Sequence, residues 1–213
     1  MPTESTTGPA PRRRGHSPKR KAVLDAATAE FLAHGFAGTS MDRIAEAARV
    51  SKRTVYDHFP GKDALFQAIA DEILARISDM PEHVYAPERP LEAQLLAIGH
   101  TFAETITDAE FMDLSRVVIA RFIQRPSMAE NTLKAHRRLR RDMIALLAAG
   151  KKDGRLSLRS PEMAAAQLCG LIKELAFWPQ LTAGQEPLST RARRAAVRSA
   201  VGLFLDHYGV RDA

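Results

Sequence analysis

The sequence has little that would support disulfide, metal or membrane chemistry. Its single cysteine, Cys169, excludes a disulfide within the chain and a cysteine-based zinc site. This cysteine content is consistent with a reducing cytoplasm, where we expect the protein to act. No apolar run approaches about 18 residues and the N-terminus has no signal-peptide hydrophobic region, so we expect no membrane partner.

Motifs for catalysis and metal binding are also missing. The seven histidines show no metal-ligand spacing, and there is no phosphate-binding loop or nucleophile motif. His58 lies beside Asp57 but has no neighbouring nucleophile or second histidine, which argues against acid–base catalysis. We therefore expect no enzyme activity, no cofactor, no metal and no catalytic residue.

Strand-like alternation and repeats are absent, whereas apolar residues recur at three- and four-residue intervals through most of the chain. This spacing predicts an all-α fold. Charge is unevenly distributed: residues 1–62 carry 11 Lys and Arg against 6 Asp and Glu, and the remainder carries 20 against 19. The excess of positive charge near the N-terminus is typical of a surface that meets a polyanion.

Residues 1–16 are rich in Thr, Pro, Gly and Arg and are predicted to form a disordered basic arm. Arg12, Arg13 and Arg14 either reach the minor groove of DNA or form a solubilising tail. A first helix is then expected from the capping residue Ser17 to a stop at Gly35.

The stretch TSMDRIAEAARVSKRTVYDHFPGK, residues 39–62, has the order of a helix-turn-helix. Met41 to Ala48 reads as a short helix with Thr39 as its cap, and residues 49–51 as a turn. The second helix runs from about Lys52 to Phe59, because Ser51 can cap it and Pro60 ends it. With the preceding helix, these elements predict a three-helix DNA-binding domain over residues 17–61.

The second helix is expected to have an apolar back, with Val55 and Phe59 together, and a polar front. Arg53 on this front is the leading base-reading residue, since a guanidinium can bind guanine in a bidentate manner. Asp57 either accepts from cytosine or only orients Arg53 as an i, i+4 pair. Thr54 is placed to meet a thymine methyl group or a phosphate, and Lys52 adds positive potential.

SKRTVYDHFPGKDALF resembles the DNA-binding signature of the TetR family of bacterial transcriptional regulators, with the likeness running from Lys19 to Phe66. It implies an all-helical homodimer with an N-terminal helix-turn-helix domain and a larger ligand-sensing domain. It also implies phosphate contacts from Tyr56, His58 and Lys62, and from Thr39 and Lys52.

Residues 62–213 are predicted to form a helical effector-binding and dimerisation domain. Its first helix, Lys62 to Met80, starts beside the DNA and is expected to act as a lever. Connections are expected at residues 125–126, 151–159 and 179–187. Further helices are predicted over residues 91–107, 108–123, 127–147, 161–177 and 189–208.

DLSRVVIARFIQRPSMAENTLKAHRRLR and GRLSLRSPEMAAAQLCGLI resemble the C-terminal domain of AefR-like members of this family. This resemblance implies that the last two long helices meet their copies in a four-helix dimer interface, although intrachain core also explains part of their apolar content. The residues predicted for this interface are Leu168, Leu171, Leu175, Val197, Val201 and Phe204.

A small, largely apolar effector is expected in the second domain. The candidate lining residues are Phe102, Ile106, Met112, Phe122 and Trp178, each of which is also compatible with plain core. The basic run over residues 136–141 reads better as a solvated helix face than as a second nucleic-acid patch.

The sequence as a whole predicts a ligand-responsive, homodimeric DNA-binding regulator, most simply a repressor released from a pseudo-palindromic operator by its effector. The alternatives are an activator, an effector-independent DNA-binding protein, an enzyme fused to a DNA reader, and a protein-interaction module.

Overall fold

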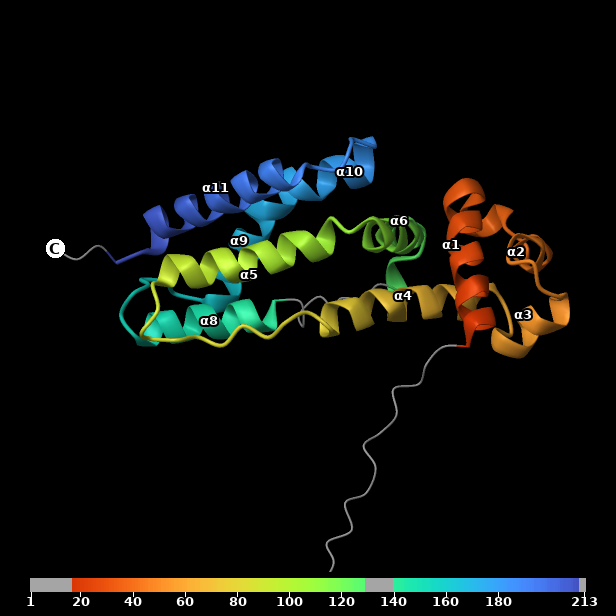
Figure 1. Ribbon diagram of the computed structural model, residues 1–213, viewed down its shortest axis with the longest axis horizontal. Helices are drawn as coiled ribbons and strands as arrows, with labels where there is room; N and C mark the ends of the chain where they lie inside the picture. Colours follow the sequence, from red (N-terminus) through yellow and green to blue (C-terminus); the bar gives the residue numbers. More distant parts are fainter. Residues whose placement is uncertain (1–16, 129–139, 211–213) are drawn as a thin grey trace, which may run out of the picture.

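The computed structural model describes residues 17–128 and 140–210, and these form an elongated all-α molecule (Figure 1). Three helices make one end: α1 (Pro18–Gly38), α2 (Met41–Ala47) and α3 (Lys52–His58). The described residues contain no β-strand, only an isolated bridge between Leu156 and Gly209. The remaining elements are α4 (Lys62–Ser78), α5 (Leu91–Ile106), α6 (Ala109–Gln124), the 3-10 turn η1 (Pro126–Met128), α8 (Arg141–Lys152), α9 (Pro161–Ala176), α10 (Trp178–Ala183) and α11 (Thr190–Tyr208).

The end of α1 bends at Gly35, whose φ of 67° lies in the left-handed region that favours glycine. Phe36 folds back so that its ring stacks on Phe31 at 5.3 Å between centroids. The predicted interruption at Gly35 is therefore present, but helical structure resumes beyond it and reaches Gly38.

Helix α4 leaves the three-helix end and extends under α6, as Figure 1 shows. Its stripe of Leu65, Phe66, Ile69, Ile73 and Ile77 is buried. Helix α6 packs against both α1 and α4. The predicted lever is thus a single helix in contact with both parts of the molecule.

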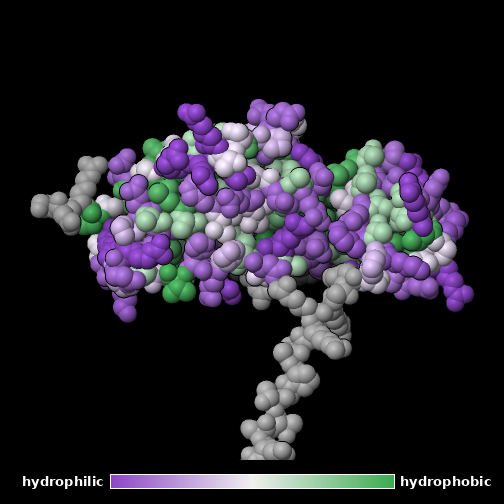
Figure 2. All heavy atoms as spheres, viewed as in Figure 1, coloured by the Kyte–Doolittle hydropathy of each residue, from purple (hydrophilic) through white to green (hydrophobic). Residues whose placement is uncertain are grey.

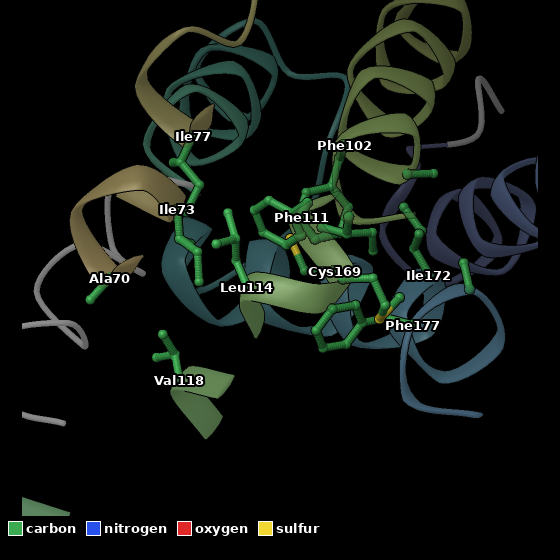
Figure 3. Packing of buried hydrophobic residues seen from close by; sticks show 14 of the residues in the cluster. Ala70, Ile73, Ile77, Phe102, Phe111, Leu114, Val118, Cys169, Ile172 and Phe177 are labelled. Atoms are coloured by element: carbon green, nitrogen blue, oxygen red, sulfur yellow. The ribbon is translucent and has the colours of Figure 1, made fainter. Parts of the chain in front are cut away.

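The core of the larger part is built from side chains of several helices that point toward one another (Figure 3). Phe102 of α5, Phe111 of α6 and Ile172 of α9 lie in its centre, while Ile73 and Ile77 approach from α4. Burial of such side chains contributes roughly 1.5–3 kcal/mol each. The core therefore connects α4 to helices α5, α6 and α9 of the larger part.

Two predicted boundaries are wrong. Residues 178–183 form the short helix α10 instead of a connection, because Pro179 lies in the first turn, where its missing N–H removes no hydrogen bond. Helix α8 continues to Lys152, beyond the predicted end at Leu147. Residues 129–139, which include His136, Arg137 and Arg138 of the basic run, lie outside the described residues, as does the arm of residues 1–16.

Candidate DNA-binding site

Helix α3 is anchored by its back. Val55 is fully buried and Phe59, which follows the last helical residue, is 3% exposed. The guanidinium of Arg20 from α1 lies 4.9 Å from the centre of the Phe59 ring. Ser51 caps the helix by accepting a hydrogen bond from the Thr54 N–H at 3.1 Å. These contacts fix which face of α3 points away from the protein.

The outward face of α3 carries Arg53 and Asp57, as the helical spacing predicts. The two side chains are 91% and 66% exposed, and Arg53 Nε lies 4.0 Å from Asp57 Oδ2. Such an exposed pair contributes little to stability. Arg53 is therefore free to exchange its partner for a base edge, and Tyr56 beside it is 51% exposed.

The other side chains predicted to contact phosphates differ in their exposure and in their hydrogen-bond partners. Lys52 Nζ lies 2.6 Å from Asp42 Oδ2 in an exposed ion pair between α3 and α2. The Thr54 hydroxyl is 2.9 Å from the Ser51 hydroxyl, and His58 is half-buried beside Phe59. Lys52, Thr54 and His58 thus border the exposed face of α3 that carries Arg53 and Asp57.

Thr39, which the sequence predicts to contact a phosphate, has internal partners in this structure. It is 3% exposed, and its hydroxyl lies 2.9 Å from two acceptors, the carbonyl oxygens of Glu30 and Gly35. Its one proton is thus used within α1, and no surface is left for a phosphate. Ser40 caps α2 instead, accepting from the Arg43 N–H at 3.2 Å. The cap of α2 is therefore Ser40 and not Thr39, which the sequence predicts as the cap.

Lys62 also has an internal role that the sequence does not reveal. Its ammonium group donates to the carbonyl oxygens of Phe36, Ala37 and Thr39 at 2.7, 3.4 and 2.8 Å. It also lies 4.8 Å from the centre of the Phe36 ring. An ammonium has three protons, so these bonds occupy all of them. In this conformation Lys62 fastens α4 to the end of α1 and is not available to a phosphate.

The turn between α2 and α3 contains a residue that sequence reasoning passed over. Arg49 has a φ of 55°, in the left-handed region, and is the one non-glycine residue with positive φ among those described. Its N–H donates to Glu46 O, and the Val50 N–H donates to Ala45 O. This closes the end of α2 as a glycine normally would. Only the absence of glycine from the turn could have signalled the strain.

Four of the six residues predicted for a dimer interface lie instead in the core of their own chain. Leu168, Val197 and Val201 are fully buried and Phe204 is 2% exposed, so these side chains have no surface left for a partner. Only Leu171 and Leu175, on the other side of α9, are exposed, at 38% and 52%. Sequence periodicity detects an apolar stripe but does not tell which neighbour covers it.

The predicted effector residues are not equivalent. Phe102, Ile106 and Met112 are buried, and Phe122 packs edge-on against Phe66 at 6.2 Å. Trp178 is 39% exposed and packs against Phe177. Among these five, Phe102 borders a hollow of about 20 Å³ that is also lined by Ile77, Met80, Pro81, His83, Ile98, Asp142 and Met143.

Neither a metal-binding cluster nor a membrane-spanning helix is found among the described residues. No group of three or more His, Cys, Asp or Glu residues in residues 17–128 and 140–210 is arranged to hold a metal ion. No helix of this part of the chain has the length and apolar character needed to cross a bilayer.

Two family models match the chain. Residues 23–69 match "Bacterial regulatory proteins, tetR family", and residues 93–210 match "AefR-like transcriptional repressor, C-terminal domain". The first range contains α2 and α3, and the second contains α6 to α11. The matches therefore divide the chain near where the structure passes from the small helical end to the larger part.

Solved structures of individual regulators are similar to this chain over most of its length. The crystal structure of a TetR family transcriptional regulator from Pseudomonas syringae pv. tomato str. DC3000 is 40% identical, with a TM-score of 0.77, and the alignment covers 92% of this chain and 99% of that one. The flavonoid-responsive regulator FrrA is 26% identical, with a TM-score of 0.68, over 92% and 100% of the two chains.

The HTH-type transcriptional regulator RutR of Escherichia coli (strain K12) is 46% identical over 69 residues, but this match spans only 32% of each protein. The regulator from Pseudomonas syringae, in contrast, matches along almost its whole length. The exposed polar face of α3, the helical second part and both family models lead to the same conclusion: the chain belongs to the TetR family of DNA-binding transcriptional regulators, with an AefR-like C-terminal domain.

Proposed function

We propose that the protein is a homodimeric repressor that binds a pseudo-palindromic operator and leaves it when a small effector binds the second domain. The observation that carries this proposal is the free polar face of α3. Arg53 and Tyr56 are exposed there, while Val55 and Phe59 anchor the helix from behind. A helix fixed in this way presents its side chains to a major groove without first reorganising.

Within this proposal, Arg53 reads a base and Asp57 either reads the next base or orients Arg53. Lys52, Thr54, Tyr56 and His58 contact the backbone phosphates that set the register. Thr39 and Lys62 act indirectly, since their polar groups hold α1 against α2 and α4. The positive charge of residues 1–62 supports the same surface through long-range attraction.

The proposed dimer uses the outer sides of α9 and α11. Leu171 and Leu175 of α9 are exposed, as is Leu203 of α11, at 57%. Gly170 and Gly202 on these helices have no atom within 4 Å of the place where a Cβ would stand, so a second backbone can approach closely. Exposed apolar side chains of this kind mark an interaction surface. A two-fold axis here would present two copies of α3 to successive half-sites.

The effector is proposed to act at the junction of α4, α5 and α8, where Phe102 borders the small hollow. A volume of about 20 Å³ admits no more than a water molecule, so an effector must displace the surrounding side chains. Ile77, near the end of α4, is among these residues, and its movement would shift α4 and hence the spacing of the two readers. The description of FrrA as flavonoid-responsive supports a small, largely apolar effector class.

The test begins with selection of genomic fragments by the full-length protein, followed by titration of the selected operator and of random DNA. Arg53→Ala is expected to weaken the free energy of operator binding by about 1–3 kcal/mol and to relax specificity at one base position. Lys52→Ala is expected to weaken both DNAs alike and to reduce the salt slope by about one.

Lys152→Ala is the matched control, because Lys152 is an exposed cation at the end of α8, which lies at the opposite end of the molecule from α3 (Figure 1). It should leave both affinities unchanged. If Arg53→Ala weakened operator and random DNA by the same factor, Arg53 would be a phosphate contact and base reading would have to lie elsewhere.

A further inference from the structure

A hollow of about 390 Å³ lies where α1 meets α6 and α10. In Figure 2 a notch at the upper edge separates the lobe of α1–α3 from the rest of the molecule at this junction. Its walls are mostly apolar and include Phe31, Phe66, Val117 and Leu181. The volume falls within the roughly 300–1,000 Å³ typical of small-ligand sites. None of the residues predicted to bind the effector lines it.

Two charged side chains, Arg116 and Arg121, interrupt these apolar walls. Arg121 of α6 lines the hollow and is only 8% exposed. Its guanidinium stacks over the Phe36 ring at 3.7 Å, and its Nε has no hydrogen-bond acceptor among the described residues. Its nearest carboxylate is that of Asp63, 3.6 Å from Nη2, and the Asp63 side chain is 79% exposed. The pair is long, and its carboxylate partner is mostly in solvent, whereas the guanidinium is buried.

A second arginine in the same hollow shows what full pairing looks like. Arg116 donates to Asp113 at 2.7 Å and to the carbonyl oxygen of Gln180 at 3.0 Å. Arg121, although more deeply buried, has no equivalent acceptors within residues 17–128 and 140–210. Burying a guanidinium without full pairing is unfavourable, and a carboxylate is the group that fits its planar fork of donors.

We propose that this hollow between α1, α6 and α10 binds a small amphipathic carboxylate, with the carboxylate on Arg121 and the apolar tail against Phe31, Phe66 and Val117. The exposed side chains of Leu32 and Ile123, at 40% and 76%, form its rim and give the tail an entry from solvent. The bound molecule touches α1 on one side and α6 and α10 on the other. It therefore bridges the DNA-binding part and the larger part of the chain.

Octanoate is the probe, with 1-octanol as a neutral molecule of the same tail and acetate as the charge without the tail. Trp178, the single tryptophan of the chain, reports binding. It lies on α10, where Thr182, a lining residue, donates to its carbonyl oxygen at 2.7 Å. We expect octanoate to change Trp178 emission saturably, with one site per chain by calorimetry, and to bind at least tenfold more tightly than octanol or acetate.

Four variants of the full chain locate the site. Arg121→Gln should lower octanoate affinity at least tenfold and remove the preference for octanoate over octanol. Arg121→Lys keeps the charge and should retain part of this preference. Ala120→Phe fills the hollow without touching the arginine and should abolish binding of both molecules. Arg125→Gln removes a charge from the end of the same helix, outside the hollow, and should change nothing.

Thermal unfolding shows whether each variant is folded, and if Arg121→Gln is not, Arg121→Lys and Ala120→Phe decide the question. The proposal is overturned if octanoate binds no better than octanol, or if the variants at residues 120 and 121 bind it as the wild type does. No DNA enters the measurement, so its failure is distinct from a failure of operator binding.

Discussion

Helix α3 and the pair α9 and α11 are both amphipathic, yet their outer faces differ in chemistry. Helix α3 buries Val55 and exposes Arg53, Tyr56 and Asp57. Helices α9 and α11 bury an apolar stripe, which includes Leu168 and Val197, and leave leucines exposed on their outer sides, Leu171 and Leu175 on α9 and Leu203 on α11.

A polar outer face is well solvated in the absence of DNA. Exposed apolar side chains, in contrast, are unfavourable in water, and burying them against a partner lowers the free energy. Amphipathic helices of the same periodicity therefore have two different roles in this molecule. In α3 the unburied face is a reader, and in α9 and α11 we interpret it as the seam of a dimer.

The largest effect is expected from Leu203→Glu, which places a charge at the exposed leucine of α11. Two such charges near a two-fold axis repel each other and lose hydration, so the dimer should dissociate. Operator affinity should then fall by about 100-fold or more, because one reader contacts only a half-site. Sedimentation and operator titration measure the two effects.

Val84→Glu is the control for this change, since Val84 is 77% exposed but lies between α4 and α5. It should leave both assembly and affinity unchanged. A dimer that persists in Leu203→Glu would show that the outer side of α11 is not the interface.

A smaller but well-defined effect is expected from Gly99→Ala, which probes the buried stripe. A Cβ at Gly99 would lie 2.9 Å from Val197 Cγ1, closer than packed carbon atoms approach. We expect the free energy of unfolding to fall by about 1–3 kcal/mol while the chain still dimerises.

The double variant Gly99→Ala, Val197→Ala removes the clashing methyl groups and should recover part of the loss in chemical denaturation. Strictly additive losses from the two single changes would contradict tight packing between α5 and α11.

Lys62→Met separates a structural lysine from a phosphate contact. Because the three carbonyl oxygens at the end of α1 lose their donor, the free energy of unfolding should fall by about 1–3 kcal/mol. The salt slope of DNA binding should not change. Lys52→Met, at an exposed lysine of α3, should do the reverse, lowering the slope by about one with little loss of stability. A reduced slope in Lys62→Met would restore the role implied by family resemblance.

The smallest effect concerns the turn before α3. Arg49→Gly and Arg49→Ala remove the same charge, but only glycine adopts a φ of 55° without steric cost. The glycine variant should therefore be more stable than the alanine variant by about 0.5–1 kcal/mol in thermal unfolding. Equal stability of the two variants would show that the turn relaxes out of the left-handed region.

The sequence by itself determined the order of the helices, the two faces of α3 and the family, because all three depend on local periodicity, capping and residue type. The interruption of the first helix at Gly35 was likewise predicted from neighbouring residues. Prediction from the sequence failed where two neighbouring residues could fill the same structural role. Thr39 and Ser40 can each cap α2, and only the carbonyl oxygens of Glu30 and Gly35 assign Thr39 to α1.

Tertiary structure alone decided what each apolar stripe and each buried charge meets. Val197 and Leu203 lie six residues apart on α11, and only the position of α5 buries the first and leaves the second exposed. Lys62 binds carbonyl oxygens more than twenty residues away in sequence, and Arg121 faces a hollow lined by four helices, α1, α4, α6 and α10. Such contacts depend on how helices pack at long range, and no periodicity within a single helix encodes them.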